Sequence, residues 1–108
     1  MIRSTPLREV LRQLLAVLDN ERQALAGLAF DDITIAAQQK LAKCEEIEKF
    51  PDTSIDEECR AMLQSARNMN ETNRQIRNLV AANIEARINM LTGSPHIYGR
   101  SQRAALRG

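Results

Sequence analysis

The sequence predicts an all-α protein: an antiparallel three-helix bundle or coiled-coil hairpin with a long third helix and a flexible C-terminal tail. Its 108 residues are enough for one domain with a modest core. Only Phe30, Phe50 and Tyr98 are aromatic, so the core must be aliphatic, which favours packed helices over sheets. The few Gly and Pro residues leave long stretches rich in Leu, Ala, Gln, Glu and Arg, which favour helix.

The first helix is expected at about residues 6–29. Thr5 is placed to cap it, with Pro6 at the first helical position, where a missing N–H costs no hydrogen bond. A heptad seam follows, with Glu21 as its one polar position. Its apolar members are Leu7, Leu11, Leu14, Leu18, Leu25 and Leu28. Gly27 lies near the end of this pattern, and an Asp of Phe30-Asp31-Asp32 is expected to cap the next helix.

The second helix is expected at about residues 32–50, where Pro51 stops it. Its apolar side would consist of Ile33, Ala37, Leu41, Cys44 and Ile47. Cys44 and Cys59 lack CxxC spacing and fall at apolar helical positions, so we expect buried reduced thiols, although a disulfide between them is geometrically conceivable. Ser54 and Glu57 fit a capping box at the start of the third helix.

The third helix is expected at about residues 55–92, which with the first two forms a bundle over residues 1–92. About 38 helical residues would span roughly 57 Å, so the first helix is too short to cover them. The apolar seam is Cys59, Met62, Ala66, Met69, Asn73, Ile76 and Val80, followed by Ile84, Ile88 and Leu91. Steps of four residues replace the heptad after Ile76, and this stutter rotates the apolar face. Either the second helix adds cover, or part of the third presents apolar surface to another molecule.

Polar residues in this seam allow two interpretations. Asn73 either sets the register inside the bundle, with the other Asn residues solvated, or belongs with Asn83 to a mixed groove that binds a partner helix. Met62 and Met69 are expected in the core. Met90 lies on the flank of the shifted seam and is more open.

Enzyme signatures are absent from the sequence. The single His96 has no second His or acidic cluster at metal-ligand spacing, neither Cys has a helix-borne His as its base, and there is no Gly-rich phosphate loop. We therefore expect a protein that is not an enzyme and uses no metal or cofactor.

The charge of +1 is distributed unevenly, because residues 93–108 contain three Arg and no acid. Three Arg would give only weak, salt-sensitive nucleic-acid binding, so no nucleic-acid partner is expected. The residues Ile97, Tyr98, Arg100 and Arg103 instead suggest a short peptide anchor for an acidic rim, with a merely solubilising tail as the alternative. Without a signal-peptide core or an 18-residue apolar run, we expect a cytoplasmic protein that does not insert into membranes.

Several segments together resemble the flagellar export chaperones of the FlgN type. They are LLAVLDNERQAL in the first helix, LAFDDI and QQKLAKCEEIEKF in the turn and second helix, ARNMNETNRQIRNLVAANIEARINML in the third, and YGRSQR near the end. The resemblance covers most of the chain. It implies a cytosolic chaperone that binds the C-terminal segments of hook-associated proteins, keeps them from assembling early and delivers them to the cytosolic domain of the export gate.

The resemblance also implies roles for residues. The family's cargo site lies in the C-terminal half and corresponds to Asn73, Ile76, Val80, Ile84 and Ile88, and Tyr98 would dock at the gate. From the helical pattern we add Asn83, Met90 and Leu91 to the expected cargo site, and from the composition of the tail we add Ile97, Arg100 and Arg103 to the expected docking peptide. Three alternatives stay open: a chaperone for filament or filament-cap subunits, a structural coiled-coil adaptor or self-assembling bundle without cargo, and a weak nucleic-acid binder. The sequence also leaves a homodimer open.

Overall fold

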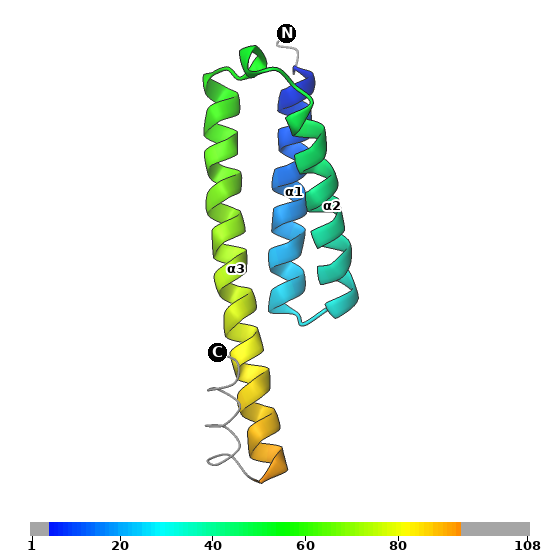
Figure 1. Ribbon diagram of the computed structural model, residues 1–108, viewed down its shortest axis with the longest axis vertical. Coiled ribbons are helices and arrows are strands. Elements are labelled where there is room, and N and C mark those ends of the chain that lie inside the picture. Colours follow the sequence, from blue (N-terminus) through cyan, green and yellow to red (C-terminus); the bar gives the residue numbers. More distant parts are fainter. Residues whose placement is uncertain (1–4, 94–108) are drawn as a thin grey trace, which may run out of the picture. The chain divides into compact units, whose positions relative to one another are not determined.

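The structure, a computed structural model, describes residues 5–93 and is all-α over that range (Figure 1). It contains three α-helices, α1 (Pro6–Ala26), α2 (Phe30–Glu48) and α3 (Glu57–Thr92), and one short 3-10 helix, η1 (Asp52–Ser54). The predicted all-α fold with a long third helix is confirmed. The described chain divides into two compact units, one ending at Ile76 and the other beginning at Arg77.

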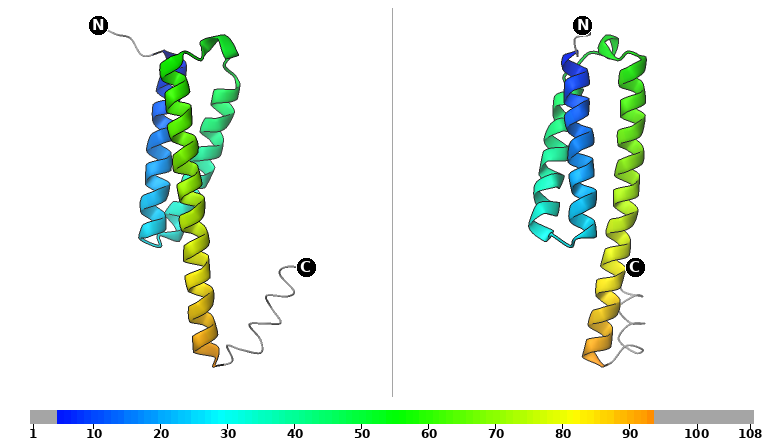
Figure 2. Two further views of the ribbon diagram at one scale, coloured as in Figure 1. Left: turned by 90° about the vertical axis from the view of Figure 1, so that its left-hand side faces the viewer. Right: turned by 180° about the vertical axis from the view of Figure 1, so that it is seen from behind.

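The first unit contains α1, α2 and the start of α3, with α2 antiparallel to both neighbours (Figures 1 and 2). The helices α1 and α2 lie side by side (Figure 1) and form the closest-packed pair. Most of the core comes from α1, whose buried residues are Leu7, Leu11, Leu14, Val17, Leu18, Glu21, Ala24 and Leu25. The predicted seam of α1 is therefore confirmed, except that Leu28 is 49% exposed.

Two apolar clusters join α3 to α1. Leu7 and Leu11 pack with Cys59, while Leu14 and Leu18 pack with Ala66. The predicted core positions Met62 and Met69 are half-buried against these clusters. Because burial of aliphatic side chains is the main favourable term in folding, these contacts hold the start of α3 to the hairpin of α1 and α2.

The side of α2 that faces the core agrees with the prediction only in part: Ile47 packs against both apolar clusters as predicted, and Ile33 is half-buried. The single buried residue of α2 is Ala36, which lies in a row with half-buried residues at steps of three and four, namely Ile33, Lys40, Lys43 and Ile47. The predicted apolar residues Ala37, Leu41 and Cys44 are exposed. Lys40 lies on the side of α2 that faces the core, although the sequence pattern predicted only apolar residues there. Its methylene groups are partly buried while its ammonium group binds Glu21.

The two cysteines differ in environment. Cys59 is buried, as predicted, whereas the prediction for Cys44 is wrong because that thiol is exposed on α2. Both are free thiols, and no disulfide joins them. Burial raises the pKa of the Cys59 thiol above its ordinary value.

The ends of α1 and α2 confirm one predicted detail and correct two. Thr5 caps α1 as expected, its hydroxyl accepting a hydrogen bond from the Arg8 backbone N–H at 3.1 Å. The chain leaves α1 three residues earlier than predicted, because Leu28 adopts a left-handed conformation with φ of 54°. Ala29 precedes α2, and no side chain caps this helix. Asp31 and Asp32 lie inside the first helical turn, where their negative charges interact favourably with the helix dipole.

Asp56, rather than Ser54, caps α3. Its carboxylate accepts a hydrogen bond from the Cys59 backbone N–H at 2.8 Å, while Ser54 belongs to η1. The guanidinium of Arg8 lies 3.1 Å from the Asp56 carboxylate and 3.0 Å from that of Glu58, and so ties the start of α1 to the start of α3. The hydrogen bond from Cys59, followed by the charge of Arg8, lowers the pKa of Asp56 below 3.8.

Replacing Asp56 with Ala is expected to lower the thermal unfolding midpoint at pH 7, because the Cys59 N–H loses its acceptor. Because folding lowers the pKa of Asp56, its stabilising effect is fully present above the ordinary pKa of 3.8. The effect is lost as the pH falls through the lower pKa that Asp56 has in the folded protein. Thermal unfolding followed by circular dichroism at pH 7 and at progressively lower pH should show the two proteins converging. The matched control is Asp52→Ala in η1, and an equal loss there would contradict the assignment of the cap.

The second unit begins with residues 77–92, the rest of α3. None of the residues from 77 to 93 is buried. No helix in the described part of the chain is long and apolar enough to cross a membrane.

Candidate functional site

The second half of α3 carries an exposed apolar surface. Its helical positions place the apolar residues on about half of the helix circumference. We call Val80, Ile84, Ile88 and Leu91 the α3 stripe; Val80 is half-buried, and Ile84, Ile88 and Leu91 are 37%, 54% and 87% exposed. A helix of about 16 residues gains little stability from its own hydrogen bonds, so covering this face would stabilise it.

Most of the predicted cargo residues belong to this surface or border it. Asn83 and Met90 are exposed beside the α3 stripe, Met90 at 77%, and Leu79, which the prediction omitted, is 67% exposed. Ile76 is half-buried at the end of the first unit. An exposed apolar face with an amide within it has the composition of a surface that binds an amphipathic helix.

Asn73 does not belong to an accessible site, and its predicted role in cargo binding is wrong. It is 1% exposed, and its amide nitrogen donates to the Leu18 carbonyl at 2.9 Å and to a carboxylate oxygen of Glu21 at 2.8 Å. The other interpretation from the sequence, a buried Asn inside the bundle, is confirmed. A buried amide without a hydrogen-bond partner costs free energy, so Asn73 favours the helix arrangement in which Leu18 and Glu21 accept its hydrogen bonds.

Glu21, Lys40 and Asn73 form a buried polar network that joins all three helices. The carboxylate of Glu21 is fully buried and accepts hydrogen bonds from the Lys40 ammonium group at 3.1 and 3.2 Å. The same ammonium group donates to Asn70 of α3 at 2.9 Å. Each helix therefore supplies one member of a network that a shifted helix would break, which fixes the register of the bundle.

A groove lies between α2 and α3 over the core of the first unit. We call it the α2/α3 groove; it has a volume of about 470 Å³. It is lined by Leu14, Leu18, Ala37, Lys40, Leu41, Cys44, Leu63, Ala66, Arg67 and Asn70. Three residues of the predicted apolar side of α2, Ala37, Leu41 and Cys44, thus line this groove, whereas Ile47 packs on the core as predicted. The sequence signal was the run Ala37, Leu41 and Cys44, which alone does not distinguish a buried face from a groove wall.

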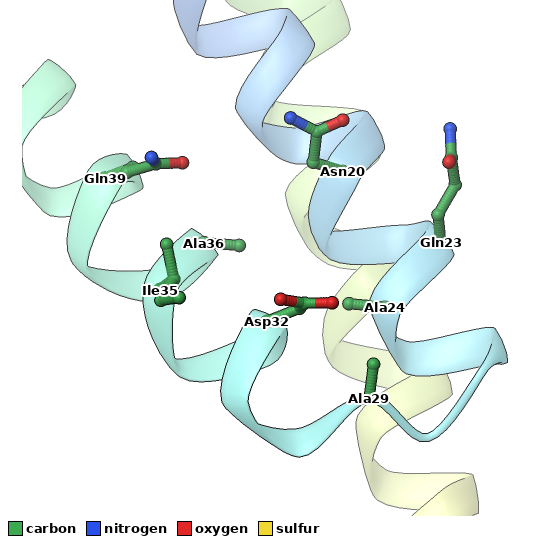
Figure 3. A pocket seen from close by; sticks show the side chains of 8 residues that line it. All are labelled: Asn20, Gln23, Ala24, Ala29, Asp32, Ile35, Ala36 and Gln39. Atoms are coloured by element: carbon green, nitrogen blue, oxygen red, sulfur yellow. The ribbon is translucent and has the colours of Figure 1, made fainter.

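A second pocket of about 420 Å³ lies between the end of α1 and the start of α2 (Figure 3). The side chains of Ala24 and Ala36 point toward one another across it, and their small size lets the helices approach. The polar residues around it, Asn20, Gln23, Asp32 and Gln39, are all exposed. Because no buried polar group points into it, the pocket gives no indication of a ligand.

The predicted gate-docking residues Ile97, Tyr98, Arg100 and Arg103 lie outside the described residues, as does His96. Within residues 5–93, no group of three or more His, Cys, Asp or Glu side chains is placed to hold a metal ion.

The chain was also compared with known proteins. No protein-family model, no curated protein and no solved structure matches it.

Proposed function

We propose that this protein is a cytosolic flagellar export chaperone of the FlgN type. It binds C-terminal helical segments of hook-associated proteins, prevents their premature assembly and delivers them to the cytosolic domain of the export gate. The observation that carries the proposal is the exposed α3 stripe. The order of the segments that resemble the family supports it.

The proposed mechanism is the packing of one helix against another. A cargo segment that assembles through an apolar face exposes that face before assembly, and the α3 stripe offers an apolar surface of matching helical spacing. Ile84 and Ile88 would contact the apolar face of the cargo helix, while the Asn83 amide would pair with polar groups at its edge. Burying the same face of the cargo excludes contacts between cargo molecules.

Keeping the cargo unassembled is the activity to test. A purified hook-associated protein is expected to stay in the supernatant after centrifugation when one equivalent of this protein is present. Ile88→Asp should fail to keep it there, because the charge would have to be buried against the cargo. Equal pelleting of the cargo with and without the wild-type protein would contradict the proposal.

The tail is proposed as a separate docking peptide for the gate, with Tyr98 as its anchor between Ile97 and the basic residues Arg100 and Arg103. Replacing Tyr98 with Ala is then expected to leave cargo affinity unchanged and to impair secretion of hook-associated proteins. Affinity is measured by titration and secretion by the amount of cargo in the culture medium. A loss of cargo affinity in this variant would contradict the division of labour.

The alternative is a coiled-coil adaptor or self-assembling bundle without cargo. The same exposed residues favour it, since a second copy would also cover Ile88 and Leu91. It predicts that Ile88→Asp converts an oligomer to a monomer. Sedimentation equilibrium of the wild-type protein and of Ile88→Asp distinguishes this alternative from the chaperone.

A further inference from the structure

We propose that the α2/α3 groove is a second docking site, which takes an amphipathic helix of another protein with carboxylates beside its apolar face. The groove lies wholly within the first unit, and the α3 stripe in the second. The inference therefore stands independently of the proposed chaperone function.

The dimensions of the groove fit a helix. Its α2 wall extends from Ala37 to Cys44 and its α3 wall from Leu63 to Asn70, about 10 Å each at 1.5 Å per residue. A helix that inserts side chains at positions i, i+4 and i+7 covers the same length and places three anchors in the groove. An extended strand places same-face side chains about 7 Å apart, so it would insert only two.

The interior of the groove is apolar and already partly formed. Leu14 and Leu18 of α1 line it and are buried in the core, whereas Leu41 on its wall is 63% exposed. A helix laid between α2 and α3 would cover Leu41 and stand across from α1. Four helices around one core are a common stable arrangement of this kind.

The charge of the groove selects the partner. Its charged lining residues are Lys40 and Arg67, and no carboxylate lines it. The Lys40 ammonium group is held by Glu21 and Asn70, while the exposed Arg67 lies on the solvent side of the wall. Because the carboxylate of Glu21 offsets the charge of Lys40, Arg67 is the cation that an Asp or Glu of a partner helix would meet, and a basic helix would be repelled by it.

A second copy of this chain fits the groove less well. Two grooves facing each other would place Arg67 of each copy against a groove that carries the same positive charge. The second half of α3 from another copy would bring Arg77 and Arg87 with the single acid Glu85. Both arrangements place like charges in contact, which disfavours them.

Cys44 offers a direct measurement, because it is the exposed thiol and lines the groove. Cys59 is buried with a raised pKa, so iodoacetamide should modify Cys44 first. The probe is a 15-residue helical peptide with Leu at positions i, i+4 and i+7 and Glu beside them; the matched peptide has Lys in place of Glu. The full chain is alkylated with each peptide and the rate is followed by mass spectrometry.

The Glu peptide is expected to slow modification of Cys44 about tenfold at saturation and to bind at least about tenfold more tightly than the Lys peptide. Arg67→Glu should reverse that preference, since Arg67 is exposed and its replacement leaves the core intact. If neither peptide protects Cys44, or if both protect it equally in the wild type and in Arg67→Glu, the proposal is wrong.

Two further measurements separate this site from the others. Ile84→Asp, in the second unit, should leave protection of Cys44 unchanged; loss of protection there would assign the peptide to the α3 stripe and overturn the proposal. Alkylation without peptide is repeated over a hundredfold range of protein concentration. A constant rate is expected, and slowing at high concentration would identify a second copy as the occupant.

Discussion

Replacing Lys40 with Met is expected to lower the free energy of unfolding by about 3 kcal/mol, as found when one partner of a buried ion pair is removed. The carboxylate of Glu21 is fully buried, and Lys40 supplies its opposite charge from 3.1 Å. Met has a stem of similar length, so the change removes the charge with little loss of packing. Urea unfolding followed by circular dichroism measures the loss.

A matched control lies one helical turn along α2. Lys43 pairs with Glu46 at 3.1 Å and with the Gln13 amide oxygen at 2.7 Å, but the Glu46 side chain is 43% exposed, whereas Glu21 is fully buried. Lys43→Met should therefore cost no more than about 1 kcal/mol. Equal losses in the two variants would show that burial of Glu21 does not determine the effect of Lys40.

The loss should be reversed by removing the second charge. In Lys40→Met with Glu21→Gln, the amide oxygen at position 21 still accepts the hydrogen bond from Asn73, and no charge is buried. The double variant is expected to recover most of the stability lost in Lys40→Met. A double variant that is less stable than Lys40→Met alone would contradict this interpretation of the network.

Ile84→Asp is expected to weaken binding of a C-terminal peptide of a hook-associated protein about 100-fold, or about 2.7 kcal/mol. Ile84 lies within the α3 stripe, so the new carboxylate would lose its water against the apolar face of the cargo. Because position 84 is 37% exposed in the free protein, the unfolding free energy should change by no more than about 1 kcal/mol. Fluorescence anisotropy of a labelled peptide measures the affinity.

Ala82→Asp is the matched control, because it introduces the same charge on the opposite side of the same helical segment. It should retain the affinity of the wild type. Equal weakening in Ala82→Asp and Ile84→Asp would show that binding depends on the charge of the segment and not on the α3 stripe.

The parts of the fold that sequence predicts best are those governed by local patterns. Thr5 and Pro6 begin α1 as expected, and the Leu seam of α1 is buried because its spacing places it on one side of the helix. The side of α2 that faces the core was predicted only in part, because Ile33 and Ile47 are half-buried as expected but Ala37, Leu41 and Cys44 are exposed. Ala37 and Ala36 differ by one position, and Lys40 enters the interior only because Glu21 and Asn70 lie beside it after folding.

The candidate sites also divide into those that the sequence predicts and those that depend on how the helices pack. The exposed α3 stripe follows from the length of α3 relative to its neighbours, which the sequence shows. For Asn73 the sequence allowed either burial or exposure, and its partner Glu21 lies 52 residues away. The α2/α3 groove was missed because it requires walls from two helices, and single-helix periodicity cannot reveal how far apart two helices pack.

Calorimetric titration of the purified wild-type protein with a C-terminal peptide of a hook-associated protein tests the central claim most directly. Circular dichroism of the same sample establishes that the protein is helical. We predict saturable binding of one peptide per chain. A folded helical protein that gives no binding heat at several temperatures would contradict the chaperone function and favour the adaptor.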